Sequence, residues 1–249
     1  MHGSWVAHRI VGMLIALVLI GDAAALAVIS ADGGGQGAAP PTSLAATTST
    51  TLAPRVIFRD DFSSDRVFRA GDDDDGSVVT IDGMYRQRFR RDLDIYTHVP
   101  EQAPEHTEVE QTQNLRISVD VQNVSGEPDN WFGLYCRSMG LGSDLYRARV
   151  SPDGSWSLDR TTIGSPYVSR TLARGRSPDI AAVQPAAFVF RLRLDCVGGA
   201  TTTLLLSIND REVGIATDPA GLGPGQAGLA ASSTTGELAF DNLVVAALA

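Results

Sequence analysis

Lysine is absent from this chain of 249 residues, and all 20 of its basic residues are arginines. The arginines do not gather into one block, which is typical of GC-rich coding bias. Asp and Glu number 29, so the net charge is −9. Phosphate-rich nucleic acids attract basic proteins, and we therefore expect no nucleic-acid partner.

Cysteine and histidine are scarce, with two and four residues. No CxxC pair or Cys/His cluster occurs, which argues against a zinc site. His98 and His106 lie in a polar stretch and not in a core-like run, so a Ser-His-Asp triad has no suitable histidine. These shortages remove two common kinds of catalytic site.

A helical apolar period is also missing from residue 55 onward, where apolar and polar residues alternate instead. The clearest alternating runs are Leu115–Val121, Phe188–Leu194 and Leu204–Ile208. Turn residues such as Pro152-Asp153-Gly154 and Asn209-Asp210 separate such runs. About a dozen short strands predict an all-β fold, a β-sandwich or jelly roll.

The same alternation places both cysteines. Cys136 shares a strand face with Phe132 and Leu134, and Cys196 shares one with Leu192 and Leu194. Both thiols should therefore point into the core, and we predict a Cys136–Cys196 disulfide. Two buried free thiols are the alternative.

Residues 1–29 contain an apolar run from Ile10 to Ile29 behind His8 and Arg9. Such a run exports the chain that follows it. Its length just suffices for a single membrane-spanning helix, but Asp22 interrupts it and Ala25-Leu26-Ala27 suits a signal-peptide cleavage site. A kept anchor in the cell membrane and a cleaved, secreted form both stay open, and both place the remainder outside the cytoplasm.

Residues 30–54 are rich in Gly, Ala, Thr, Ser and Pro and nearly uncharged. This composition predicts a flexible, disordered linker. We therefore predict three parts: an N-terminal hydrophobic helix or signal segment (1–29), the linker (30–54) and one β-domain (55–249).

Several short motifs in that domain resemble concanavalin A-like lectin/glucanase domains, a laminin-G-like jelly roll. The motifs, in chain order, are Asp60-Asp61-Phe62-Ser63, Asp82-Gly83-Met84-Tyr85, Phe132-Gly133-Leu134-Tyr135-Cys136, Tyr146–Gly154, Leu192–Cys196, Gly225–Leu229 and Phe240-Asp241-Asn242-Leu243. The resemblance covers roughly residues 56–247. It implies a jelly-roll β-sandwich of two antiparallel sheets, with the N- and C-terminal strands paired. The closing strands are also similar to the 3-keto-disaccharide hydrolase module.

Enzymes of this fold carry a Glu-x-Asp-x-Glu strand that supplies two carboxylates about 5 Å apart. The chain lacks that triplet. Glu108 and Glu110 share a strand face, but they lie in a polar stretch without an Asp between them. We therefore expect no catalytic residues, and a glycosidase-like enzyme remains the minor alternative.

Acidic residues at the two ends of the domain are the candidate metal ligands. If the terminal strands pair, Asp60 and Asp61 come close to Asp241. The resemblance implies structural calcium at such an edge, with carboxylates as suitable ligands. We expect no other cofactor.

The candidate ligand-binding face combines aromatic and charged residues opposite the core positions. Its members are Trp131, Tyr135, Arg137, Arg147, Arg149 and Asp195. Aromatic rings stack on sugars, and charged groups hydrogen-bond their hydroxyls. An ordinary solvated sheet face is the alternative.

The sequence thus predicts a non-catalytic binding module outside the membrane. Its expected partner is a glycan or cell-wall component, with contact centred on Trp131 and Tyr135. A structural or protein-interaction domain without a small ligand is the alternative function.

Overall fold

The structure is a computed structural model, and it describes residues 53–64, 68, 70–90, 93–126, 130–140, 142–163, 167–181 and 189–249. The predicted N-terminal segment and nearly all of the predicted linker lie outside these residues. Neither of the two helices in the described part is long and apolar enough to cross a membrane. They are α1 (His106–Gln111) and α2 (Pro178–Ala181).

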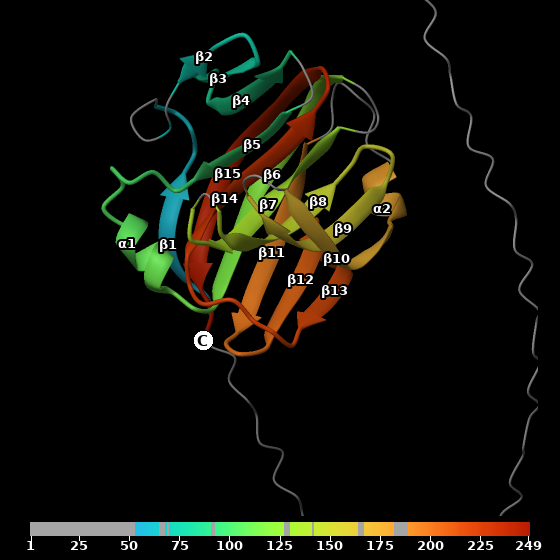
Figure 1. The fold of residues 1–249 in the computed structure, drawn as a ribbon. Coiled ribbons are helices and arrows are strands. Elements are labelled where there is room, and N and C mark those ends of the chain that lie inside the picture. Colours follow the sequence, from blue (N-terminus) through green and yellow to red (C-terminus); the bar gives the residue numbers. More distant parts are fainter. Residues whose placement is uncertain are drawn as a thin grey trace, which may run out of the picture. The chain divides into compact units, whose positions relative to one another are not determined.

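Strands form two antiparallel sheets (Figure 1). The order in the larger sheet, which has nine strands, is β13 (Arg211–Asp218), β12 (Thr202–Ile208), β11 (Val189–Gly198), β6 (Leu115–Gly126), β15 (Gly236–Ala247), β4 (Met84–Phe89), β3 (Gly76–Ile81) and β2 (Gly71–Asp72), with β1 (Arg55–Asp60) paired to β15. The order in the six-stranded sheet is β10 (Val168–Arg176), β9 (Ser155–Thr162), β8 (Asp144–Val150), β7 (Trp131–Ser138), β14 (Gln226–Ser233) and β5 (Leu93–His98). The predicted all-β architecture of two antiparallel sheets is confirmed.

The terminal strands of the domain pair with each other, as the resemblance implies. Arg55 lies opposite Ala247, and Asp60 lies opposite Leu243. The preceding part of β15 pairs with β4 instead, and the change of partner coincides with Asn242, whose φ is 53°. A left-handed residue there bends the strand, so one long strand serves two neighbours in turn.

The core lies between the two sheets and is built from the alternating apolar residues. Phe132 of β7 and Phe190 of β11 meet across it with ring centroids 5.2 Å apart, and both are at most 1% exposed. Cys136 of β7 is disulfide-bonded to Cys196 of β11, with Cα atoms 6.8 Å apart. The predicted disulfide is therefore confirmed, and it links one sheet to the other.

Candidate functional site

The outer face of the six-stranded sheet carries polar side chains in a cross-strand row. Tyr135 of β7 pairs with Arg147 of β8, Arg147 with Asp159 of β9, and Asp159 with Thr171 of β10. Side chains on the same face of adjacent antiparallel strands lie about 5 Å apart. The register therefore gathers these groups at the middle of the face.

Arg147 is buried within this row. Its Nη1 donates a hydrogen bond to Tyr96 Oη at 2.5 Å, and its Nη2 donates to Tyr167 Oη at 2.6 Å. Asp94 Oδ2 lies 3.4 Å from Nη1, and the guanidinium lies 5.9 Å from each tyrosine ring centroid. Only 2% of the Arg147 side chain is exposed, so this arginine organises the face and is not free to contact a ligand.

Asp159 is fully buried and connects the row to a second arginine. Its Oδ2 accepts hydrogen bonds from Arg149 Nε at 3.0 Å and from Ser157 Oγ at 2.8 Å, while Oδ1 accepts one from Thr171 Oγ1 at 2.8 Å. Arg147 Nη2 lies 4.0 Å from the same Oδ2. A buried carboxylate needs such partners, and here they fix the direction of Arg149.

Arg149 and Trp131 line an open cavity of about 550 Å³ at one end of this face, which we call the face cavity. The Arg149 guanidinium lies over the Trp131 indole at 4.7 Å from its centroid, a cation–π contact. The other described residues that line the face cavity are Ser155, Trp156, Ser157, Thr171, Arg174, Gly175 and Arg176. The cavity therefore combines two indoles, three guanidinium groups and several hydroxyls.

A β-bulge in β10 turns the arginines at the far wall of the face cavity toward the outer face of the sheet. The register of β10 against β9 shifts between Thr171 and Ala173, so that Arg174 lies opposite Ser157 and Arg176 opposite Ser155. Simple alternation from Thr171 would have put both arginines on the inner face. The extra residue reverses the alternation, and both then share a face with Thr171.

Trp156 occupies a slot between two glycines. A Cβ at Gly175 would lie 2.7 Å from the Trp156 ring, and one at Gly214 would lie 2.5 Å from it. Neither strand can carry a side chain at these points without moving the indole. The two glycines therefore let Trp156 fill the gap between β10 and β13 and still reach the face cavity.

The structure corrects the role expected of Tyr135. The residue lies opposite the disulfide side of β7, as predicted, but it is only 2% exposed. Tyr96 packs on it edge-on at 5.7 Å between centroids, and Leu145 and Ala230 complete a small second core. Tyr135 thus supports the face from below and does not contact a ligand bound above it.

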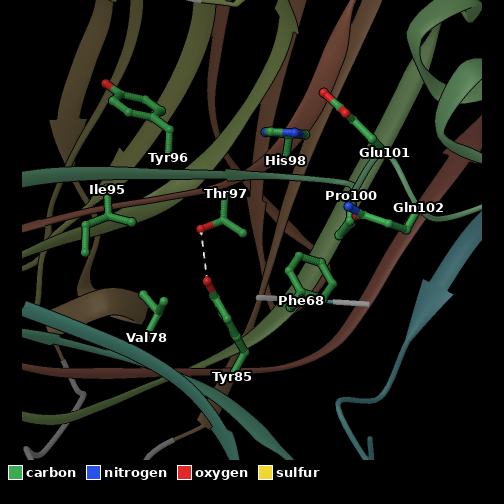
Figure 2. A pocket seen from close by; sticks show the side chains of 10 residues that line it. All are labelled: Phe68, Val78, Tyr85, Ile95, Tyr96, Thr97, His98, Pro100, Glu101 and Gln102. Carbon is green, nitrogen blue, oxygen red and sulfur yellow. Dashed lines mark hydrogen bonds between the residues drawn. The ribbon is translucent and has the colours of Figure 1, made fainter. Parts of the chain in front are cut away.

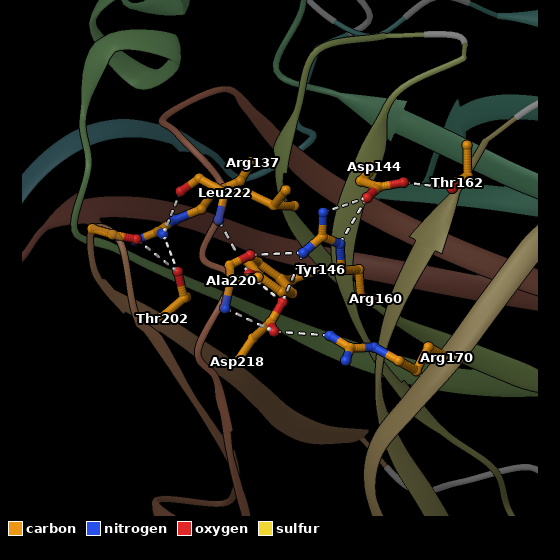
Figure 3. A network of polar contacts seen from close by, with 11 residues as sticks. Arg137, Asp144, Tyr146, Arg160, Thr162, Arg170, Thr202, Asp218, Ala220 and Leu222 are labelled. Atoms are coloured by element: carbon orange, nitrogen blue, oxygen red, sulfur yellow. Dashed lines mark hydrogen bonds and ion pairs between the residues drawn. The ribbon is translucent and has the colours of Figure 1, made fainter.

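Arg137 does not lie on this face either, contrary to the prediction. Its φ is 62°, which reverses the strand alternation after Cys136, and the residue is 1% exposed. Its guanidinium donates hydrogen bonds to Thr202 Oγ1 and to three backbone carbonyl oxygens. These belong to Gln113, Gly198 and Leu222, at 2.6–2.8 Å. Arg137 is therefore an internal tie between loops (Figure 3).

Beside Arg137, Asp218 forms the centre of a second internal network (Figure 3). Its carboxylate accepts hydrogen bonds from Tyr146 Oη at 2.9 Å, Arg160 Nη1 at 3.0 Å and Arg170 Nη2 at 2.8 Å. Burial would raise the pKa of Asp218, but these donors lower the pKa to about 2. The network fastens the end of β13 to β8, β9 and β10.

Asp195 lies on the other sheet, which is a further correction. β11 belongs to the nine-stranded sheet, and the Asp195 side chain pairs there with Arg116 through two hydrogen bonds of 2.8 and 2.6 Å. Strand alternation correctly predicted that Asp195 faces away from the core. It could not show that the outer faces of β7 and β11 look in opposite directions.

The predicted calcium ligands Asp60, Asp61 and Asp241 lie near one another where the terminal strands pair. Asp60 Oδ1 accepts the Phe62 backbone N–H, and Asp61 Oδ1 accepts that of Ser63. Burial raises the pKa of Asp241, and the nearby carboxylates of Asp120 and Asp61 raise it further. No group of three His, Cys, Asp or Glu residues in the described part of the chain could hold a metal ion. Calcium binding by Asp60, Asp61 and Asp241 therefore stays a prediction.

A second cavity of about 420 Å³ lies where β5 faces β3 and β4, and we call it the edge cleft (Figure 2). Figure 2 shows Phe68 and Tyr85 on one side of β5 and Tyr96 on the other. Tyr85 Oη and Thr97 Oγ1 are 3.3 Å apart, and burial raises the pKa of this tyrosine. The described lining of the edge cleft has more apolar residues than that of the face cavity, and Glu101 is its one carboxylate.

The sequence analysis did not identify several residues of the candidate site, among them Tyr96, Trp156, Asp159, Arg174 and Arg176. The period-2 run Ser155–Arg160 does place Asp159 opposite Trp156 and Leu158, so its face was readable. Arg174 and Arg176 depend on the bulge, and their orientation has no signal in the alternation.

The sequence matches no protein-family model and no curated protein. Among solved structures, it is similar to the carbohydrate-binding module CBM66 of Bacillus subtilis, with 14% identity, 80% of this chain and 98% of that chain covered, and a TM-score of 0.45. For the CBM2 module of the evolved Dit protein of Lactobacillus casei BL23 phage J-1, the identity is 11%, the coverage 78% and 96%, and the TM-score 0.46.

A third similar structure belongs to work on endo-acting O-glycanases that members of the human gut microbiota express to initiate mucin breakdown. The identity is 10%, the coverage is 78% of this chain and 100% of that chain, and the TM-score is 0.50. At such identities the likeness concerns the fold alone. Together with the two antiparallel sheets and the paired terminal strands, it shows that the domain has the two-sheet β-sandwich fold that the resemblance implies.

Proposed function

We propose that this domain is a non-catalytic carbohydrate-binding module whose glycan lies in the face cavity. The observation that carries the proposal is that Trp131 and Arg149, together with the mostly buried Trp156, line one open cavity of about 550 Å³. Binding sites for small ligands typically combine apolar walls with a few fixed polar groups. The face cavity has both.

The chemistry of the lining suits a sugar ring. Indole rings pack against the apolar C–H face of a pyranose. The hydroxyls of Ser155, Ser157 and Thr171 donate their protons to Asp153 and Asp159, so their oxygens can accept hydrogen bonds from sugar hydroxyls. The guanidinium of Arg149 can donate hydrogen bonds to sugar oxygens. Because Asp159 already fixes Arg149, little side-chain entropy is lost when a ligand binds.

The arrangement of carboxylates around the face cavity supports a binding role rather than hydrolysis. Glycosidases place two carboxyl groups about 5–9.5 Å apart on either side of the bond that breaks. The described lining of the face cavity contains no Asp or Glu. Asp159 lies beneath it, is 0% exposed and is occupied by Arg149, Ser157 and Thr171.

We also propose that the module acts outside the cytoplasmic membrane, held there by residues 1–29 or secreted after their cleavage. The Cys136–Cys196 disulfide supports an oxidising compartment. A reporter fused after Pro54 should be active only outside the cytoplasm, and activity of that fusion inside the cytoplasm would contradict export.

A glycan and cell-wall-fraction array probed with the full-length protein tests the binding proposal. Trp131→Ala should lower affinity for the glycans that bind by about 1–3 kcal/mol, typical of a lost aromatic contact. Ile215→Ala is the matched control, because Ile215 is 57% exposed on the nine-stranded sheet, away from the cavity. Unchanged binding in Trp131→Ala, or no bound glycan at all, would refute the proposal.

A further inference from the structure

The face cavity is positively charged in an otherwise acidic protein. Its described lining contains Arg149, Arg174 and Arg176 and no carboxylate, whereas the whole chain has a net charge of −9. Clustered charge of one sign in a concave site concentrates ligands of the opposite sign. The aromatic residues indicate that a sugar ring can bind in the face cavity, and the clustered arginines indicate in addition that this ligand is negatively charged.

Strand register fixes the spacing of these arginines. Ser157 of β9 lies between Arg149 of β8 and Arg174 of β10, and each of the two pairs with it. Neighbouring strands are about 4.8 Å apart, so the two arginines begin about 10 Å from each other on one face. Arg176 follows Arg174 by two residues and points the same way. Their side chains can thus converge on a group about the size of one sugar residue.

The three arginines differ in how far their charge is already neutralised. Arg149 is paired with buried Asp159 at 3.0 Å, and Arg176 is paired with Asp153 at 2.5 Å. Among the residues that the structure describes, the side chain of Arg174 has no hydrogen-bond or ion-pair partner, and the residue is exposed. A free guanidinium beside the cavity, with its planar set of donors, is suited to carboxylate, sulfate and phosphate.

We infer that the glycan bound by the face cavity is anionic, with its acidic group held by Arg174 and Arg176 and its ring against Trp131. This inference rests on the proposed function and adds the chemical class of the ligand. Hydroxyl contacts alone would not require an unpaired guanidinium on the far wall. An acidic sugar uses both the aromatic wall and the cationic wall.

The experiment compares an acidic polymer with its neutral counterpart. Full-length protein is titrated with polygalacturonate oligosaccharides and with the same oligosaccharides after reduction of their carboxyl groups. Sulfated and phosphorylated oligosaccharides form two further arms, which distinguish the source of the negative charge. We expect at least one acidic arm to bind about tenfold more tightly than its uncharged counterpart, and its affinity to fall as salt rises.

Two variants separate the inference from simple charge effects. Arg174→Gln should lower affinity for the acidic ligand about tenfold and leave affinity for neutral oligosaccharides unchanged. Arg211→Gln removes the same charge from an exposed residue of β13, and it should change neither affinity. An equal loss of affinity for the acidic ligand in both variants would mean that only the net charge of the protein matters, and it would overturn the inference.

The outcomes also separate the inference from the proposed function. Neutral oligosaccharides that bind as tightly as acidic ones, with loss in Trp131→Ala but not in Arg174→Gln, would overturn the anionic ligand and keep the carbohydrate module. Absence of binding in every arm would overturn both.

Discussion

The outer faces of the two sheets use arginine and aspartate in different ways. On the nine-stranded sheet, Arg116 pairs with Asp195 and Arg191 pairs with Asp120. On the six-stranded sheet, Asp159 is buried beneath Arg149, while Arg174 beside it has no partner among the described residues. The paired charges on the nine-stranded sheet neutralise each other. On the six-stranded sheet, the guanidinium of Arg174 has no described partner and can bind an anion.

Cavity size follows the same division. The face cavity measures about 550 Å³, and the cavity beside Arg86, Arg88 and Glu237 on the nine-stranded sheet measures about 170 Å³. The bulge in β10 and the glycines around Trp156 open the first. The second lies beside Glu237, whose carboxylate accepts hydrogen bonds from Arg86 and Arg88. The difference between the faces therefore comes from backbone irregularity as much as from residue type.

Removing the buried acid should produce the largest effect. Asp159→Asn deprives Arg147 and Arg149 of a shared carboxylate in a buried setting, and breaking such a pair costs about 3–5 kcal/mol. Asp210→Asn is the control, because Asp210 pairs with Arg193 on the other face but is 80% exposed. Its expected change is below about 0.5 kcal/mol. Equal changes in urea-unfolding free energy would remove the distinction between the faces.

Adding one methyl group beside Trp156 should have the next largest effect. The Cβ of Gly175→Ala would lie 2.7 Å from the indole, and Gly214 closes the opposite side, so the ring cannot move freely. Overpacking of this kind costs about 1–3 kcal/mol. Gly199→Ala, in the turn between β11 and β12 of the nine-stranded sheet, meets no atom within 4 Å and should be nearly neutral. Thermal unfolding of both variants measures the difference, and a neutral Gly175→Ala would show that the slot is loose.

Acid should weaken the sandwich mainly through Asp218. Its folded-state pKa of about 2 lies below the ordinary value of 3.8, so its contribution is complete above about pH 4 and is lost as pH falls toward 2. After allowance for solvent screening, the loss is about 1–2 kcal/mol. Asp218→Asn should be less stable than the parent at pH 7, and its stability should depend less on pH between 4 and 2. Parallel pH profiles for the two proteins would contradict this assignment.

Alternation in the sequence predicted the sandwich and the disulfide, because period 2 holds through most of each strand. It predicted the outward direction of Trp131 and Arg149 for the same reason. It was wrong for Arg137, where a positive φ reverses the face to which the side chain points. It could not predict the direction of Arg174, because a β-bulge in β10 reverses the alternation there. It also could not tell that β7 and β11 belong to different sheets, which misplaced Asp195. Local pattern thus determines facing within a strand, whereas bulges and sheet assignment depend on tertiary pairing.

The smallest expected effect concerns the paired face and tests whether its charges support one another. Glu237 accepts hydrogen bonds from Arg86 at 3.0 Å and from Arg88 at 2.8 Å, and Arg88 is 60% exposed. Arg88→Gln should lower the free energy of unfolding by less than about 0.5 kcal/mol, because the exposed pair is screened and Arg86 remains. Glu237 itself is only 8% exposed, so the double variant with Arg86→Gln leaves a nearly buried carboxylate without either arginine. The double variant should therefore lose more than the sum of the two single changes. Additive losses in urea unfolding would mean that the face is a set of independent surface pairs, and the contrast with the linked network around Asp159 would then be sharper still.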